Sequence, residues 1–157
     1  MIRRLLFFAG TLVLASGCSR DTAFEYFTKL DSTQERAVGN YRRITLSDGN
    51  LTEAIINVLY LNPVEPDLFH GNHYFFISLY DRNKRPLQEY NLTLNGEPAA
   101  GIVMLDRNCS LSRLLPLNNP WNVYYEAVFK RLEDENLTLR FEIDPSLTGE
   151  AVYRLVR

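Results

Sequence analysis

The sequence predicts an all-β protein, an antiparallel sandwich of the immunoglobulin-like kind with about eight strands. Hydrophobic and polar residues alternate over much of the chain after residue 40, and turn sequences containing Gly or Pro recur at short intervals. The length of 157 residues suits a single domain with its own core. A closed barrel, which is also built from short strands, is the alternative fold.

A short helical segment is predicted ahead of the strands. Phe24, Phe27 and Leu30 recur at helical spacing. Ser32 followed by Glu35, like Thr22 followed by Glu25, has the spacing of a capping box. We therefore expect one or two helical turns within residues 18–39 and a sandwich domain over residues 40–157.

The predicted strands fall into two groups. Period-two alternation, which is typical of a strand with one buried face, covers residues 41–47, 87–94, 137–143 and 151–156. Apolar or aromatic residues on both faces, which indicate doubly covered strands, occur at residues 54–61, 74–80 and 122–130. A weaker strand is expected at residues 101–105.

Two of these strands carry aromatic residues on both faces. Tyr125 and Phe129 alternate with Tyr124 in one strand, and Phe75 alternates with Phe76 in the other. Trp121, Val123 and Ala127 share the face of Tyr125 and Phe129, and one face of each strand must lie in the core. The other face is either a Tyr-rich contact surface or is covered by the segment around Phe24 and Phe27, and we favour the cover.

The first eighteen residues form an export signal. Arg3 and Arg4 precede an apolar run, residues 5–15, that is too short to span a bilayer, which needs roughly 20 residues. The small residues before Cys18 resemble the lipobox of bacterial lipoproteins, with Ala15 where leucine is commoner. The resemblance implies cleavage before Cys18, lipidation of its sulfur and firm anchoring to a membrane. A plain secretory signal is the alternative. Ser19 after the cysteine implies sorting to the outer membrane.

The cysteine count and the charge restrict the possible partners. Once Cys18 is acylated, Cys109 is the one remaining cysteine, so no internal disulfide can form and Cys109 is expected to be an inert, buried residue. Loss of the signal changes the formal charge from −2 to −4. This acidic balance argues against nucleic acid as a partner. We expect the domain without its lipid to be a monomer.

Four Asn-x-Ser/Thr triplets share a further feature. Asn50, Asn91, Asn108 and Asn136 each have an acidic residue two places earlier: Asp48, Glu89, Asp106 and Asp134. The extended pattern resembles the acceptor sequon of the N-glycosylation system of the campylobacter group. Four such matches would arise by chance at a frequency of roughly two in ten thousand. The competing interpretation is that these are ordinary turns leading into strands that begin with Leu-Thr.

The sequence also suggests an order of accessibility for the four sites. Asn50 lies in a predicted turn and Asn136 at the end of a charged loop, so we expect these two to be modified first. Asn91 is expected on the exposed face of a strand. Asn108 ranks last, because Cys109 follows it.

Signals for catalysis are weak, and we expect neither an enzyme nor a cofactor. His70 and His73 lie in a loop that contains Asp67 and can be brought together around a metal, but a polar loop is the simpler interpretation. Asp81 with Asn83 begins like a calcium loop but lacks its glycine and closing glutamate, which favours a turn. The nucleophile-elbow, phosphate-loop and dinucleotide motifs are missing from the sequence.

The lipobox and the four sequons together resemble small outer-membrane lipoproteins of the campylobacter group with an immunoglobulin-like domain. That resemblance implies a lipid-anchored binding or adhesion module, held to the membrane at Cys18 and engaging a protein or envelope partner. The alternative is a structural or assembly accessory of an outer-membrane complex, facing the periplasm. A metal-dependent enzyme built on His70 and His73 is a third hypothesis.

Overall fold

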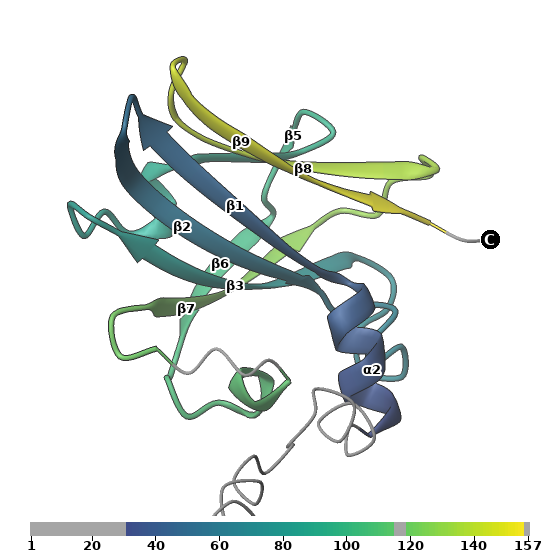
Figure 1. Cartoon of the computed structure of the whole chain (residues 1–157). Helices are drawn as coiled ribbons and strands as arrows, with labels where there is room; N and C mark the ends of the chain where they lie inside the picture. The colour runs from purple at the N-terminus through teal and green to yellow at the C-terminus, as the bar shows by residue number, and fades with distance from the viewer. Residues whose placement is uncertain (1–30, 115–118, 156–157) are drawn as a thin grey trace, which may run out of the picture. The chain divides into compact units, whose positions relative to one another are not determined.

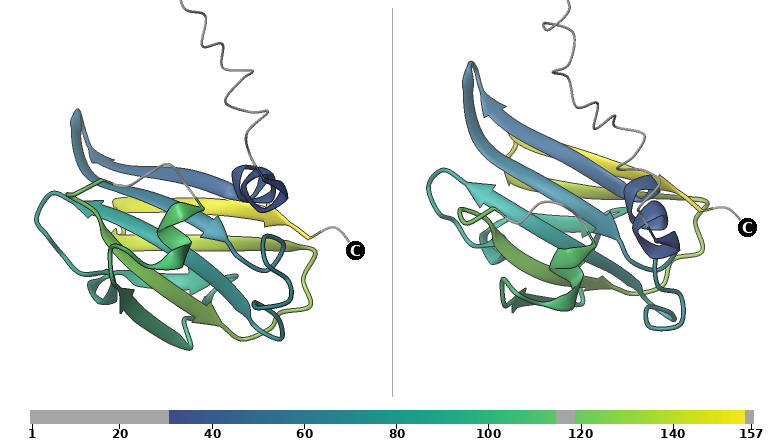
Figure 2. Two further views of the ribbon diagram at one scale, coloured as in Figure 1. Left: turned by 90° about the horizontal axis from the view of Figure 1, so that it is seen from below. Right: turned by 60° about the horizontal axis from the view of Figure 1, so that its bottom comes forward.

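The computed structural model describes residues 31–114 and 119–155, and it confirms the all-β prediction. Two antiparallel sheets face each other, as Figures 1 and 2 show. One has the strand order β1-β2-β3-β7-β6 and the other β5-β4-β8-β9. The strands are β1 (Tyr41–Asp48), β2 (Leu51–Tyr60), β3 (His73–Asp81), β4 (Asn91–Leu94), β5 (Glu97–Pro98), β6 (Gly101–Leu105), β7 (Val123–Phe129), β8 (Asn136–Asp144) and β9 (Leu147–Arg154).

The path of the chain through the two sheets is that of an immunoglobulin-like sandwich. The chain crosses between the sheets after β3, β5 and β7, and the strand pairs β4–β5, β6–β7 and β8–β9 are each antiparallel neighbours. Strands β2-β3-β7-β6 thus take the places of A-B-E-D, and β5-β4-β8-β9 those of C′-C-F-G. Strand β1 is an additional strand, which pairs with the edge of β2 that faces away from β3.

Two details differ from the sequence-based prediction of about eight strands. The described residues contain nine strands, because the two-residue strand β5 was not expected. The stretch 87–94, predicted as one strand, is a 3₁₀ turn η1 (Leu87–Glu89) followed by β4. Leu87 and Tyr90 are both buried at a spacing of three residues, which a strand would place on opposite faces.

The main core lies between the sheets and includes one aromatic face of each of the strands β3 and β7. Tyr125, Ala127 and Phe129 of β7 are buried there together with Phe75 of β3. The rings of Phe75 and Phe129 meet edge to face with centroids 5.7 Å apart. Tyr125, Ala127 and Phe129 therefore mark the core face of β7, whereas Trp121 and Val123, which share that face in the sequence pattern, are exposed.

The outer face of the five-stranded sheet carries a second apolar cluster. Phe76 and Tyr124 stack there with ring planes 5° apart. The segment after β2, the 3₁₀ turn η2 (Ser110–Arg113) and the helix α2 (Ser32–Gly39) contribute Leu61, Leu111 and Ala37 to this cluster. This face is therefore covered, as predicted. Phe24 and Phe27, which were expected to supply the cover, lie outside the described residues.

Helix α2 begins one residue earlier than its capping pattern suggested. Asp31 is the N-cap, and its carboxylate accepts hydrogen bonds from the N–H groups of Thr33 and Gln34. The Gln34 side chain in turn accepts from the N–H of Asp31. The expected pair Ser32 and Glu35 does not form this box, because Asp31 and Gln34 supply the same chemistry one position upstream.

Strands β1 and β9 approach each other closely at one side of the sandwich. A Cβ atom added to Gly149 of β9 would lie 2.4 Å from Cγ2 of Ile44 and 2.7 Å from Cδ2 of Leu46. Arg42 of β1 spans the same junction, where its Nε donates to the carbonyl of Val152 at 3.3 Å and its guanidinium lies over the ring of Tyr153. The two sheets therefore meet here through side-chain packing on a glycine.

Candidate functional site

The predicted lipidation site Cys18 lies outside the described residues, as does the whole predicted signal at residues 1–17. Among the described residues, no helix has the length and apolar character needed to cross a membrane.

The four predicted glycosylation sites are all solvent-exposed. Asn50, Asn91, Asn108 and Asn136 are exposed, and so are the four acidic residues that precede them by two positions. Asn50 lies in the turn between β1 and β2, where Gly49 has a left-handed φ of 56°. Each predicted acceptor and the acid that precedes it are therefore accessible from solvent.

Three of the triplets also have a structural explanation. Strand β2 begins immediately after Asn50, and β4 and β8 begin at Asn91 and Asn136, so Asn-Leu-Thr marks a strand start in each case. The leucines that follow in β4 and β8, Leu92 and Leu137, are buried in the core. The Leu-Thr part of the pattern is thus explained by strand alternation at these sites.

Asn136 is held more tightly than its predicted loop position suggested. Its carbonyl accepts a hydrogen bond from the side-chain amide of Asn95 at 2.9 Å, and the same amide donates to Asp134 at 2.7 Å. The amide oxygen of Asn95 accepts from the N–H of Thr138 at 2.6 Å. Asn136 also pairs with Arg154 in the ladder between β8 and β9. The basis for ranking Asn136 beside Asn50 is therefore removed.

Asn108 lies in a loop, and its acidic neighbour has a local role. The carboxylate of Asp106 accepts a hydrogen bond from the N–H of Asn108 at 2.8 Å, which is an Asx turn. Cys109, expected to be buried, is partly buried and packs beside the second apolar cluster. The N–H of Cys109 also donates to the carbonyl of Asp106 at 3.0 Å, so the backbone on both sides of Asn108 is held in this turn.

His70 and His73 do not form a metal site together. His70 is exposed, whereas His73 is buried and both of its ring nitrogens have partners. Nε2 accepts from the N–H of Leu132 at 3.1 Å, and Nδ1 lies 2.9 Å from the hydroxyl of Tyr60. Within residues 31–114 and 119–155, no group of three or more His, Cys, Asp or Glu side chains is placed to hold a metal.

The hydrogen bonds fix the protonation of this histidine. Because Nε2 is an acceptor, a neutral imidazole must carry its proton on Nδ1 and donate it to the Tyr60 oxygen. Burial lowers the pKa of His73 below 6.5, and the charge of Arg131 acts in the same direction. Burial raises the pKa of Tyr60 to about 12, against an opposing effect of Arg131. Burial thus favours the neutral form of both groups.

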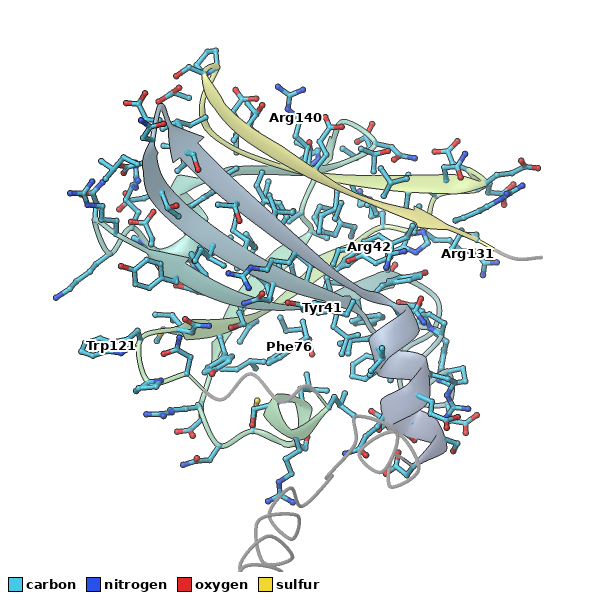
Figure 3. All side chains as sticks on the ribbon, in the orientation of Figure 1. Tyr41, Arg42, Phe76, Trp121, Arg131 and Arg140 are labelled. Atoms are coloured by element: carbon cyan, nitrogen blue, oxygen red, sulfur yellow. The ribbon has the colours of Figure 1, made fainter. Side chains whose placement is uncertain are left out.

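These two residues line a cavity of about 520 Å³ at one end of the sandwich. Two loops form its walls, residues 61–72 between β2 and β3 and residues 130–135 between β7 and β8. The lining includes Phe69, His70 and Asn72 from the first loop and Arg131 and Glu133 from the second. Figure 3 labels Arg131, which lies at the end of the molecule away from Trp121.

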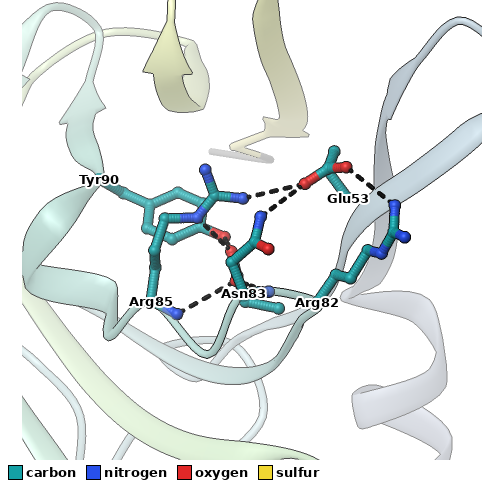
Figure 4. Close-up of polar contacts among 6 residues, drawn as sticks. Glu53, Arg82, Asn83, Arg85 and Tyr90 are labelled. Carbon is teal, nitrogen blue, oxygen red and sulfur yellow. Dashed lines mark hydrogen bonds and ion pairs between the residues drawn. The ribbon is translucent and has the colours of Figure 1, made fainter.

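A polar network closes the turn after β3 (Figure 4). Asp81 is 8% exposed, and its carboxylate accepts from the Tyr90 hydroxyl at 2.6 Å and from Nε of Arg85 at 2.9 Å. Glu53 of β2 lies within 3.4 Å of both Arg82 and Arg85. Burial alone would raise the pKa of Asp81, but the hydrogen bonds from Tyr90 and Arg85 outweigh it and the pKa is lowered. The turn interpretation of this segment is consistent with these contacts.

Four exposed apolar side chains lie in strand β6 or close in sequence to the start of its neighbour β7. Trp121 is 76% exposed and Met104 is 67% exposed, with Val103 and Val123 beside them in sequence. Met104 pairs with Tyr125 across the two strands, so it points to the inner side of the sheet. Strand β6 ends the order of the five-stranded sheet. Val103 precedes Met104 in the strand and so points to the outer side, opposite Met104 and Val123. We call Met104, Trp121 and Val123 the edge patch.

The sequence analysis missed most of the residues in these two places. Tyr60 and Arg131 reach the cavity through loop packing, for which the sequence carries no local signal. The edge patch did have a local signal in the sequence. Residues 101–105 are apolar on both faces although the strand is short, which is unusual for a strand at the end of a sheet.

No family model, curated protein or solved structure matches this chain.

Proposed function

We propose that this chain is a lipid-anchored binding domain of the bacterial outer membrane, non-catalytic, which engages a protein partner through the edge patch. The observation that carries the proposal is the exposure of Trp121 and Met104 beside the terminal strand β6. Large exposed apolar side chains that cluster on a folded domain mark protein contact surfaces, and aromatic residues and Met are enriched there.

The sequence supports the anchored location. The lipobox-like run ending at Cys18 followed by Ser19 accords with lipid attachment and sorting to the outer membrane. Replacement of Cys18 by Ala should abolish incorporation of a fatty-acid label, because its thiol is the atom that carries the diacylglycerol. Unchanged labelling in this variant would contradict the anchor.

The partner surface is tested by site-specific photo-crosslinking in intact cells. A benzophenone side chain at Met104 should give a discrete adduct, and the same group at exposed Thr148 of β9 serves as the control. Trp121→Ser should remove the Met104 adduct while leaving the protein folded, since Trp121 is outside both apolar clusters. Equal adducts at both positions, or none at Met104, would refute the edge patch as the contact.

The competing function is a periplasm-facing accessory of an outer-membrane complex. Protease treatment of whole cells separates the two: digestion indicates a surface-exposed binding module, and protection until the envelope is opened indicates the accessory.

A further inference from the structure

We propose that the cavity between residues 61–72 and 130–135 binds a small hydroxylated carboxylate, such as a sugar acid. This site is separate from the edge patch. Strand β7 begins at Val123 of the patch and ends at Phe129, just before the cavity loop, so the two places lie about 20 Å apart along the strand. The inference therefore does not depend on the proposed partner contact.

The hydroxyl of Tyr60 is a hydrogen-bond donor that is available to a ligand in the cavity. His73 donates from Nδ1 to the Tyr60 oxygen, because the N–H of Leu132 occupies Nε2. The Tyr60 hydroxyl therefore acts as an acceptor toward His73 and still has its own hydrogen to donate. Within residues 31–114 and 119–155, this hydrogen has no acceptor, and Tyr60 is only 4% exposed. A buried donor of this kind is costly unless a ligand or water satisfies it.

A positive charge, that of Arg131, lies in the same cavity as this donor. Arg131 lines the same cavity and acts electrostatically on both Tyr60 and His73. It forms no ion pair within the described residues. A neutral O–H donor and a guanidinium on one site match a carboxylate, whose oxygens accept from both.

The other lining residues indicate the chemistry of the rest of the ligand. The carboxylates of Glu133 and Asp134 lie on the same rim, and each already has an interaction partner, which for Asp134 is the amide of Asn95. These carboxylates would repel a ligand that is anionic throughout, but they accept hydrogen bonds from hydroxyl groups. Phe69 supplies an apolar surface in the same lining. A volume of about 520 Å³ has room for a ligand of monosaccharide size.

The test uses the full chain, purified with detergent and labelled with ¹⁵N, and glucuronate as the probe. Glucuronate should shift the amide resonance of Leu132, because this N–H is bonded to His73 of the Tyr60–His73 pair. Glucose has the same ring without the carboxylate, and acetate has the carboxylate without the hydroxyls. Both should bind at least roughly tenfold more weakly than glucuronate, since each lacks one set of hydrogen bonds.

Two variants assign the effect to the proposed residues. Arg131→Gln should weaken glucuronate binding at least roughly tenfold, and Arg43→Gln, at an exposed position of β1, should leave it unchanged. Tyr60→Phe should weaken it as well, and if that variant fails to fold, the Arg131→Gln result decides. Glucose binding as tightly as glucuronate, no shift at Leu132 with glucuronate, or unchanged affinity in Arg131→Gln would each overturn the proposal.

Discussion

Gly149→Ala is the substitution for which the structure sets the clearest expectation. The new methyl carbon would lie 2.4 Å from Cγ2 of Ile44 and 2.7 Å from Cδ2 of Leu46, whereas carbon atoms in contact are ordinarily about 3.5–4.0 Å apart. Ile44 and Leu46 are buried in the core, so strands β1 and β9 must separate or both side chains must leave their positions. Overpacking of this kind costs about 1–3 kcal/mol. The reduced entropy of the unfolded chain offsets about 0.4–1 kcal/mol of it.

Chemical denaturation followed by circular dichroism measures the effect. Trp121 is too exposed to be a good fluorescent probe of unfolding. Gly101→Ala is the matched control: Gly101 is also in a strand, its φ is not positive, and no atom lies within 4 Å of its added Cβ. We expect Gly101→Ala to be neutral or slightly stabilising. Ile44→Ala should reduce the penalty of Gly149→Ala in a double-mutant cycle. A Gly149→Ala protein as stable as the Gly101→Ala protein would refute the close packing of β1 on β9.

Three further predictions follow from polar groups. Because the pKa of His73 in the folded protein lies below 6.5, the unfolded chain takes up a proton on this residue first as the pH falls. The free energy of unfolding should therefore decrease as the pH drops below 6.5. In unfolding titrations, His73→Gln should remove this dependence and His70→Gln should not. Tyr90→Phe should lower the free energy of unfolding by about 1.5–3 kcal/mol at pH 7, since it removes a buried hydrogen bond to a carboxylate; an unchanged denaturation midpoint would count against the network. In a host with acid-dependent N-glycosylation, Asp48→Ala should abolish glycan mass at Asn50 without loss of stability, and an unmodified wild-type protein would return the motif to turn chemistry.

Strand positions were predictable because burial on one face leaves a direct record in the sequence. Strand β6 was predicted with both of its observed ends, and the alternation in β7 placed Tyr125 and Phe129 together on one face, which the structure shows to be the core face. The prediction of a single strand at residues 87–94 was wrong because the alternation there is accidental. The buried hydroxyl of Tyr90 needs Asp81 as a partner, and a 3₁₀ turn at Leu87 brings the two together. Such a contact depends on tertiary structure, which periodicity does not record.

The candidate sites were less predictable for the same reason. Sequence chemistry drew attention to His70 and His73 as a pair, whereas the structure pairs His73 with Tyr60 and Leu132. The cavity is assembled from two loops separated by more than fifty residues, and its charged member, Arg131, belongs to no motif.

Folding requirements explain some of the four sequons more completely than others. Strand alternation explains Asn-Leu-Thr at Asn91 and Asn136, where the leucine enters the core, and an Asx turn explains the acid before Asn108. At Asn50 the corresponding leucine, Leu51, is 47% exposed, so core packing does not require it. No side-chain hydrogen bond within the described residues ties Asp48 to the turn. Folding chemistry thus accounts least for the full pattern at Asn50, so the presence or absence of a glycan at this site is the sharpest test of the sequon prediction.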